Sequence, residues 1–143
     1  MARPVTSSAG RTGPLWALFG FDGRLSREPY WLGFLFIFLM VSYATAPLAA
    51  PTEERGVMIS PITFVVFIAA VWSQFALAVK RLHDRDLTGW YCLVLFAPIL
   101  LMATPLFIPA ATIVNFGFFG AIGLVPGTPG PNRYGPGPNR RSR

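Results

Sequence analysis

The sequence has few of the side chains on which most enzyme chemistry depends. It contains one histidine and one cysteine in 143 residues. A single chain therefore cannot build a zinc ribbon, a histidine pair or a Cys–His dyad, and Cys92 cannot form an intramolecular disulfide. His83 and Asp84 are adjacent, but even with Asp86 they leave most of a metal's coordination sphere unfilled. We expect no metal site and no cofactor.

Catalytic motifs are missing as well. No G-x-S-x-G elbow, P-loop or dinucleotide fingerprint occurs in the sequence, and each of these supplies the backbone geometry that its chemistry needs. A Ser-His-Asp arrangement that forms only in the fold stays open. We expect that the protein is not an enzyme.

Charged residues make up only 13% of the chain, against roughly 25% in an ordinary soluble domain. They fall in four clusters, which leave uncharged gaps of 24, 24 and 46 residues at 29–52, 56–79 and 87–132. A helix needs about 20 residues to cross a hydrocarbon core about 30 Å thick, so the gaps allow one, one and two crossings. We predict an all-α integral membrane protein, a small bundle of four transmembrane helices.

Two other interpretations of the apolar stretches are weaker. As a soluble core, they would leave too few polar residues to cover so small a domain. As a cleaved signal peptide, the first stretch would be cut after the A-x-A step of Ala44 and Ala46. The polar segment before this stretch is 29 residues long, however, and Pro47 stands where the cut needs a flexible residue.

Lysine and arginine indicate the orientation, because they resist translocation across the membrane. If the chain crosses four times, 11 of the 12 basic residues lie on one side and only Arg55 lies on the other. A three-crossing arrangement would instead separate the arginines of the tail from the rest. We therefore expect the N and C termini to be cytoplasmic.

Local signals divide the chain into three parts. Residues 1–26 form a cytoplasmic N-terminal segment, in which the aromatic stretch 14–21 is too short to cross and is expected to lie on the membrane surface. Ser26 is placed to cap a helix that begins near residue 27. Residues 126–143 form a Pro/Gly/Arg-rich cytoplasmic tail. The membrane domain between them, 27–125, has predicted crossings at about 27–47, 57–79, 89–105 and 109–125.

The predicted crossings contain no ionisable side chain deep within them, which disfavours ion-coupled transport. Gln74 and Asn115 are their only amides, and these either line a polar cavity or, as we expect, form hydrogen bonds between helices. Gly117 and Ala121 have small-xxx-small spacing, which lets helix backbones approach closely. We expect the last crossing to pack inside the bundle or against another copy, unless its glycines merely reflect membrane-helix composition.

The tail 126–143 repeats the sequence GPNR at 130–133 and 137–140. A segment so rich in proline and glycine cannot form a packed core by itself. Its arginines either touch anionic lipid or extend into solvent.

Three segments carry a resemblance to a known family. They are FDGRLSREPYW at 21–31, KRLHDRDLTGWY at 80–91 and PGTPGPNRYGP at 126–136. In this order they resemble the signature segments of the YhaH-like bacterial inner-membrane family, domain of unknown function 805. The resemblance implies a small multi-pass protein of the bacterial cytoplasmic (inner) membrane, and it implies no established activity.

The first two segments bring ionisable residues to the predicted cytoplasmic face. Two arrangements are open for them. The basic residues at one membrane level would ring an anionic headgroup. Alternatively, Arg24 or Arg81 pairs with Asp84 or Asp22 and locks the N-terminal segment against the connection that follows the second crossing. The candidate polar cluster consists of Asp22, Arg24, Arg27, Lys80, Arg81, His83 and Asp84.

Two functions remain compatible with these features. The first is a noncatalytic scaffold, assembly or regulatory module that contacts a second copy of the chain or another membrane protein. The second is anionic-lipid binding or neutral-solute transport through the polar cluster. Membrane lipids are expected partners in both cases, and nucleic acid is not an expected partner.

Overall fold

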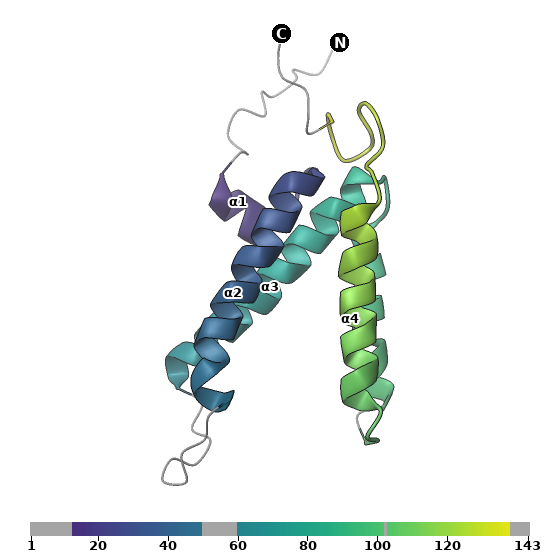
Figure 1. The fold of residues 1–143 in the computed structure, drawn as a ribbon. Coiled ribbons are helices and arrows are strands. Elements are labelled where there is room, and N and C mark those ends of the chain that lie inside the picture. The colour runs from purple at the N-terminus through teal and green to yellow at the C-terminus, as the bar shows by residue number, and fades with distance from the viewer. Residues whose placement is uncertain (1–12, 50–59, 102, 138–143) are drawn as a thin grey trace, which may run out of the picture.

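The structure is helical across the residues that it describes. This computed structural model describes residues 13–49, 60–101 and 103–137. The long elements form two pairs, α2 with α3 and η1 with α4, which meet at one end and diverge toward the other (Figure 1). The elements are the α-helices α1 (Pro14–Phe19), α2 (Arg27–Ala49), α3 (Pro61–Asp84) and α4 (Phe107–Leu124), and the 3₁₀ helix η1 (Gly89–Leu101).

Local signals explain where α2 and α3 begin. The first residue of α2 is Arg27, as predicted. Before α3, the side chain of Ser60 accepts a hydrogen bond from the backbone N–H of Ile62 at 3.3 Å, and Pro61 occupies the first turn. Such a cap satisfies one of the backbone donors that a helix start leaves free. The predicted start of this crossing at residue 57 lies outside the described residues.

The far end of α3 extends beyond its predicted limit at Val79. The helix continues through Lys80 and Arg81 to Asp84. These three charged side chains are buried, and each has partners inside the protein. The chain then turns at Asp86, whose φ of 60° ends the helical geometry.

Among the described residues, three helices are long and apolar enough to cross a membrane: residues Arg27–Ala46 of α2, then α3 and α4. The third predicted crossing, 89–105, takes a different form, because its helical part is the 13-residue η1 with Pro98 inside it. A 3₁₀ helix rises about 2.0 Å per residue, so η1 reaches about 26 Å, close to the length of about 27 Å of α4. The two elements lie side by side and antiparallel (Figure 1).

The buried core lies at the end where the helix pairs meet. Tyr30 of α2 is fully buried, and its hydroxyl donates to the carbonyl oxygen of Phe119 in α4 at 2.9 Å. Leu77 and Leu82 of α3 belong to the same cluster. Toward the other end, apolar side chains such as Ile62 point outward, at 75% exposed. Outward-facing apolar residues suit helices that lipid surrounds.

The close contact of α4 with its neighbours occurs at Gly123. A Cβ atom on Gly123 would lie 2.6 Å from ring atoms of Tyr30 and Trp31, whereas nothing lies within 4 Å of a Cβ on Gly117. The expected contact at the Gly117 and Ala121 spacing is therefore not made with any of the described residues. Gly123 lies nearer to the end where the pairs converge, and there α4 packs closely against the Tyr30 and Trp31 rings of α2.

The two amides of the membrane domain do not link helices as expected. Asn115 donates from Nδ2 to the carbonyl oxygen of Ala111 in its own helix at 3.0 Å. The buried Oε1 of Gln74 has no hydrogen-bond partner among the described residues. No continuous polar path through the described helices follows from these two positions.

The predicted surface stretch folds into the short helix α1, which is fastened to α3. Nζ of Lys80 donates to the carbonyl oxygen of Trp16 at 2.7 Å and to that of Ala17. Nε1 of Trp72 donates to the carbonyl oxygen of Phe19 at 3.2 Å. A helix leaves its last carbonyls without internal partners, so α3 supplies donors to the end of α1, where the Trp16 carbonyl also accepts from the backbone N–H of Gly20.

Candidate functional site

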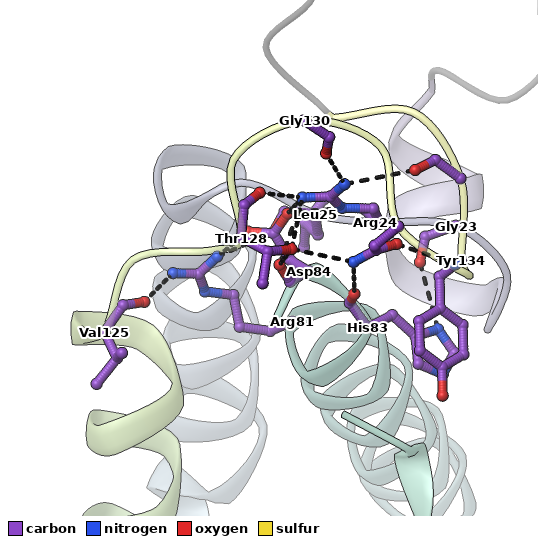
Figure 2. A network of polar contacts seen from close by, with 12 residues as sticks. Gly23, Arg24, Leu25, Arg81, His83, Asp84, Val125, Thr128, Gly130 and Tyr134 are labelled. Atoms are coloured by element: carbon purple, nitrogen blue, oxygen red, sulfur yellow. Dashed lines mark hydrogen bonds and ion pairs between the residues drawn. The ribbon is translucent and has the colours of Figure 1, made fainter. Parts of the chain in front are cut away.

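Three charged side chains form a buried ion-pair network at the end where the helix pairs meet (Figure 2). Oδ1 of Asp84 lies 2.9 Å from Nη2 of Arg24, and Oδ2 of Asp84 pairs with Nη1 of Arg81. The side chains of Arg24, Arg81 and Asp84 are 2%, 0% and 5% exposed. An unpaired buried charge costs several kcal/mol (~3–5 when one partner is removed), so their burial requires this pairing. We call these three residues the polar clasp.

Arg81 connects the polar clasp to the end of α4. Its Nε donates to the carbonyl oxygen of Ile122 at 2.9 Å, and its Nη2 donates to that of Val125. The final carbonyls of a helix have no internal donors and carry partial negative charge. A guanidinium placed there both satisfies them and fixes the end of α4 beside α3.

Arg24 connects the polar clasp to the segment that follows α4. Nη2 of Arg24 donates to the carbonyl oxygen of Thr128 at 2.7 Å, and Nη1 donates to that of Gly130 at 2.5 Å (Figure 2). We call residues 126–137 the C-terminal strap, because they cross over the end of α3 and return (Figure 1). The strap thereby covers the ion pairs.

Further contacts hold the C-terminal strap on α3. The backbone N–H of Thr128 donates to the carbonyl oxygen of Asp84 at 2.8 Å, and Nδ2 of Asn132 donates to that of His83 at 2.8 Å. These bonds satisfy the orphan carbonyls at the end of α3. The strap is therefore ordered by partners from elsewhere in the chain, in contrast to the solvated tail that its composition suggested. Residues 138–143 lie outside the described residues.

His83 contacts the strap without joining the polar clasp. Its ring stacks on that of Tyr134, with centroids 3.8 Å apart and planes 8° from parallel. Its Nδ1 donates to the carbonyl oxygen of Gly23 at 3.3 Å, and since a carbonyl can only accept, this bond fixes the proton on Nδ1. Lys80, whose amine bonds to α1, also lies 4.6 Å from the centroid of the Trp16 ring.

Two members of the predicted cluster lie outside the network. Asp22 and Arg27 are exposed, and within the described residues neither side chain makes a hydrogen bond or an ion pair. The structure therefore brings Arg24, Arg81 and Asp84 together, binds Lys80 and His83 to neighbouring segments, and leaves Asp22 and Arg27 free to meet other molecules.

A polar pocket of about 450 Å³ adjoins the polar clasp. Its walls come from the start of α2, the end of α3 and the C-terminal strap. They include Arg24, Arg27, Arg81 and Asp84, so three cationic groups face one carboxylate. Within the described residues, no group of three or more His, Cys, Asp or Glu side chains is placed to hold a metal ion.

Sequence reasoning did not identify the residues of the strap as part of the site. Thr128, Asn132 and Tyr134 all contact the end of α3. One signal was available, because Thr128 and Asn132 fall within the third segment that carried the family resemblance. The composition did not indicate their role. A proline- and glycine-rich composition shows that a segment cannot form a packed core by itself, but it does not show whether the segment packs against the rest of the chain.

Comparison with known proteins identifies the family. Residues 18–136 match the family described as "Protein of unknown function (DUF805)". The chain belongs to this family. DUF805 relatives include "Inner membrane protein YhaH" of Escherichia coli (strain K12), which is 30% identical over 121 residues that cover 83% of this chain and 87% of the relative. No solved structure matches the chain.

Two more DUF805 relatives from the same strain are similar over most of their length. "Inner membrane protein YhaI" is 30% identical over 120 residues, 83% of this chain and 86% of the relative. "Uncharacterized protein YiiR" is 29% identical over 131 residues, 82% of this chain and 85% of the relative. The resemblance noted from the sequence is confirmed. With its candidate spans, this DUF805 chain is a multi-pass inner membrane protein.

The polar clasp joins all three segments that resemble DUF805. Arg24 comes from the first, Arg81 and Asp84 from the second, and the carbonyls of Thr128 and Gly130 from the third. Arg24 and Thr128 are separated by 104 residues in the sequence. Segments that look unrelated in the sequence are therefore parts of one structure.

Proposed function

We propose that the protein is a noncatalytic membrane module, which assembles with a second copy or with another membrane protein. The observation that supports this proposal is the internal pairing of Arg24 and Arg81 with Asp84. A catalytic carboxylate or base must reach a substrate. Both oxygens of this carboxylate are instead engaged by arginines, and the strap lies over them.

The polar clasp supports a positioning role. It joins the residues before α2, the end of α3, the end of α4 and the strap through one set of buried charges. Breaking a buried pair costs about 3–5 kcal/mol, since the remaining charge is left without compensation. Such a network holds helix ends in one arrangement, which is what an assembly surface requires.

We propose further that the chain crosses the membrane four times and that the clasp end is cytoplasmic. The length of η1 beside α4 supports the fourth crossing. The basic residues at the clasp end support the orientation, because lysine and arginine accumulate on the cytoplasmic side. Those of the described residues are Arg24, Arg27, Lys80, Arg81, Arg85 and Arg133.

Reporter fusions test this topology. Green fluorescent protein fused after Arg143 is expected to fluoresce, because it folds in the cytoplasm. Alkaline phosphatase inserted at Thr104, between η1 and α4, is expected to be active, because it requires export. An active phosphatase fused after Arg143 would contradict four crossings with cytoplasmic termini.

Stoichiometry in native membranes tests the assembly function. The chain is extracted in polymer-bounded nanodiscs after cross-linking in the cell, and the mass of the recovered complex is measured. We expect a defined complex that Asp84→Asn disrupts and Asp86→Asn retains, because Asp86 pairs only on the surface with Arg133. A wild-type chain that stays monomeric under these conditions would contradict the proposal.

Anionic-lipid binding is a second candidate function. A specific observation favours it: the pocket beside the polar clasp is lined by three arginines and one aspartate. A net positive pocket at the level of the headgroups suits a phosphate. This function does not compete with assembly for the same side chains, since Arg27 takes no part in the clasp.

A further inference from the structure

Two pockets adjoin one another at the start of α2, and Arg27 lines both of them. The first is the polar pocket of about 450 Å³ that includes Arg24 and Arg81. The second has about 660 Å³, and it lies between the start of α2 and the end of α4. Both volumes are in the range of about 300–1,000 Å³ that small-molecule sites occupy. The second pocket is lined by Arg27, Glu28, Trp31, Leu32, Gly123 and Leu124.

We propose that these two pockets together bind one anionic phospholipid of the leaflet at the clasp end. The headgroup phosphate lies in the polar pocket against Arg27, and an acyl chain follows Trp31, Leu32 and Leu124 along the groove between α2 and α4. This inference deepens the second candidate function and rests on it. It does not depend on the assembly function.

Hydrogen-bonding capacity singles out Arg27 as the phosphate ligand. The donors of Arg24 are occupied by Asp84 and by strap carbonyls. Those of Arg81 are occupied by Asp84 and by the carbonyl oxygens of Leu25, Ile122 and Val125. The exposed Arg27 has its guanidinium donors available among the described residues. A guanidinium can hold two phosphate oxygens at once. Arg24 and Arg81 therefore contribute positive electrostatic potential to the pocket, and Arg27 contributes the hydrogen bonds to the phosphate.

The sum of charges favours an anionic headgroup. Three arginines line the two pockets, and the carboxylates are Asp84 in the first and Glu28 in the second. The balance is one positive charge. A phosphodiester with an uncharged head alcohol would neutralise it. A zwitterionic headgroup would place its ammonium among the arginines, with Glu28 as its only accessible carboxylate.

The order of polar and apolar groups matches a lipid rather than a free phosphate. Arg27 and Trp31 are four residues apart on α2, as are Glu28 and Leu32, so each pair lies on one helix face. The face changes from charged to apolar within one turn, toward the membrane interior. Trp31 stands at the boundary, where tryptophan is common in membrane proteins. Free phosphate would use only the polar pocket.

Gly123 forms the closed floor of the groove, where α4 packs directly against α2. A Cβ there would lie 2.6 Å from ring atoms of Tyr30 and Trp31, so any side chain at this position would push α2 away and change the shape of the groove. The exposed Leu32 and Leu124, each 69% exposed, form the two rims. An acyl chain in this position would cover apolar surface on two candidate membrane spans at once.

Native mass spectrometry of the full chain in detergent tests the proposal. The probe is dioleoyl phosphatidylglycerol, and dioleoyl phosphatidylethanolamine and inorganic phosphate serve as comparison ligands. We expect one phosphatidylglycerol bound with preference over phosphatidylethanolamine. We expect Arg27→Gln to weaken this binding about tenfold, the equivalent of one charge-assisted contact. Inorganic phosphate at equal concentration is expected to compete poorly.

Arg133→Gln is the matched control. It removes one exposed arginine from the same end of the molecule, but Arg133 lines neither pocket. Its phosphatidylglycerol affinity is expected to stay at the wild-type level. Arg27→Gln is expected to keep the wild-type melting temperature, because the side chain has no partner within the described residues, and this keeps loss of binding distinct from loss of folding.

Each alternative outcome overturns a defined part of the proposal. If wild type binds no phosphatidylglycerol, both the lipid-binding function and this site are wrong. If it binds the lipid but Arg27→Gln and Arg133→Gln behave alike, only the site is wrong. If Glu28→Gln weakens binding and phosphatidylethanolamine binds better, the headgroup is zwitterionic. If inorganic phosphate competes as well as the lipid, the ligand is a soluble phosphate.

Discussion

Gly127 lies directly against the carboxylate of Asp84. A Cβ atom on Gly127 would overlap Oδ2 of Asp84, far inside van der Waals contact. The C-terminal strap can cross the polar clasp at this point only because residue 127 has no side chain. The glycine of the PGTPG sequence therefore has a packing role that its place in a proline-rich tail does not suggest.

Replacing Gly127 by alanine is expected to detach the strap from α3 or to strain the polar clasp. Overpacking a close contact typically costs about 1–3 kcal/mol, so the melting temperature in detergent should fall measurably. Gly117→Ala is the control, because nothing lies within 4 Å of a Cβ at that position. Equal melting temperatures for the two variants would show that the strap does not rest on Asp84.

Asp84→Asn is expected to destabilise the protein by about 3–5 kcal/mol, because it leaves two buried arginines without their counter-ion. Asp86→Asn removes a carboxylate two positions away that pairs on the surface with Arg133, 3.2 Å from Nε. That change should cost only about 0–1 kcal/mol. Unfolding free energies in mixed micelles compare the two. A small effect at both positions would place Asp84 in an exposed pair.

Tyr30→Phe is expected to cost about 1 kcal/mol, the typical net value of one hydrogen bond, because it removes the donor to the Phe119 carbonyl. Tyr43→Phe provides the comparison, since Tyr43 is 86% exposed and is expected to be neutral. The same unfolding assay applies. If Tyr30→Phe were also neutral, α2 and α4 would not be joined by this bond.

The start of α2 at Arg27 and the apolar character of the spans were predictable, because both follow from local composition and from proline placement. The end of α3 was not. Lys80 and Arg81 suggested an interfacial end of the helix near Val79, since lysine and arginine usually reach for water or phosphate. Here they bond to α1, α4 and Asp84, and these partners are distant in the sequence.

The pairing of Arg24 and Arg81 with Asp84 was one of two arrangements that the residue types allowed. Sequence alone could not choose between pairing and headgroup binding, because both use the same charges at the same membrane level. The contacts of the C-terminal strap could not be predicted from the sequence, for another reason. Its carbonyls and the hydroxyl of Thr128 form bonds with groups more than 40 residues away, and composition carries no information about such partners.

Glycine spacing did not indicate where α4 packs closely within this chain, for a similar reason. The small-xxx-small pattern at Gly117 and Ala121 indicates where another helix could approach α4 closely. Where a helix does so depends on where the two helix pairs converge. That convergence lies at Gly123 against Tyr30 and Trp31, and it depends on the whole arrangement in Figure 1.

Arg24 and Asp84 act as one buried unit that fastens three parts of the chain. A double-mutant cycle with Arg24→Gln, Asp84→Asn and the combined variant measures this most directly, with unfolding free energy in mixed micelles as the quantity compared. We predict that the combined variant is no less stable than Asp84→Asn alone, with a coupling energy of about 2 kcal/mol or more. Strictly additive losses would contradict the claim, because they would mean that the two side chains do not depend on one another.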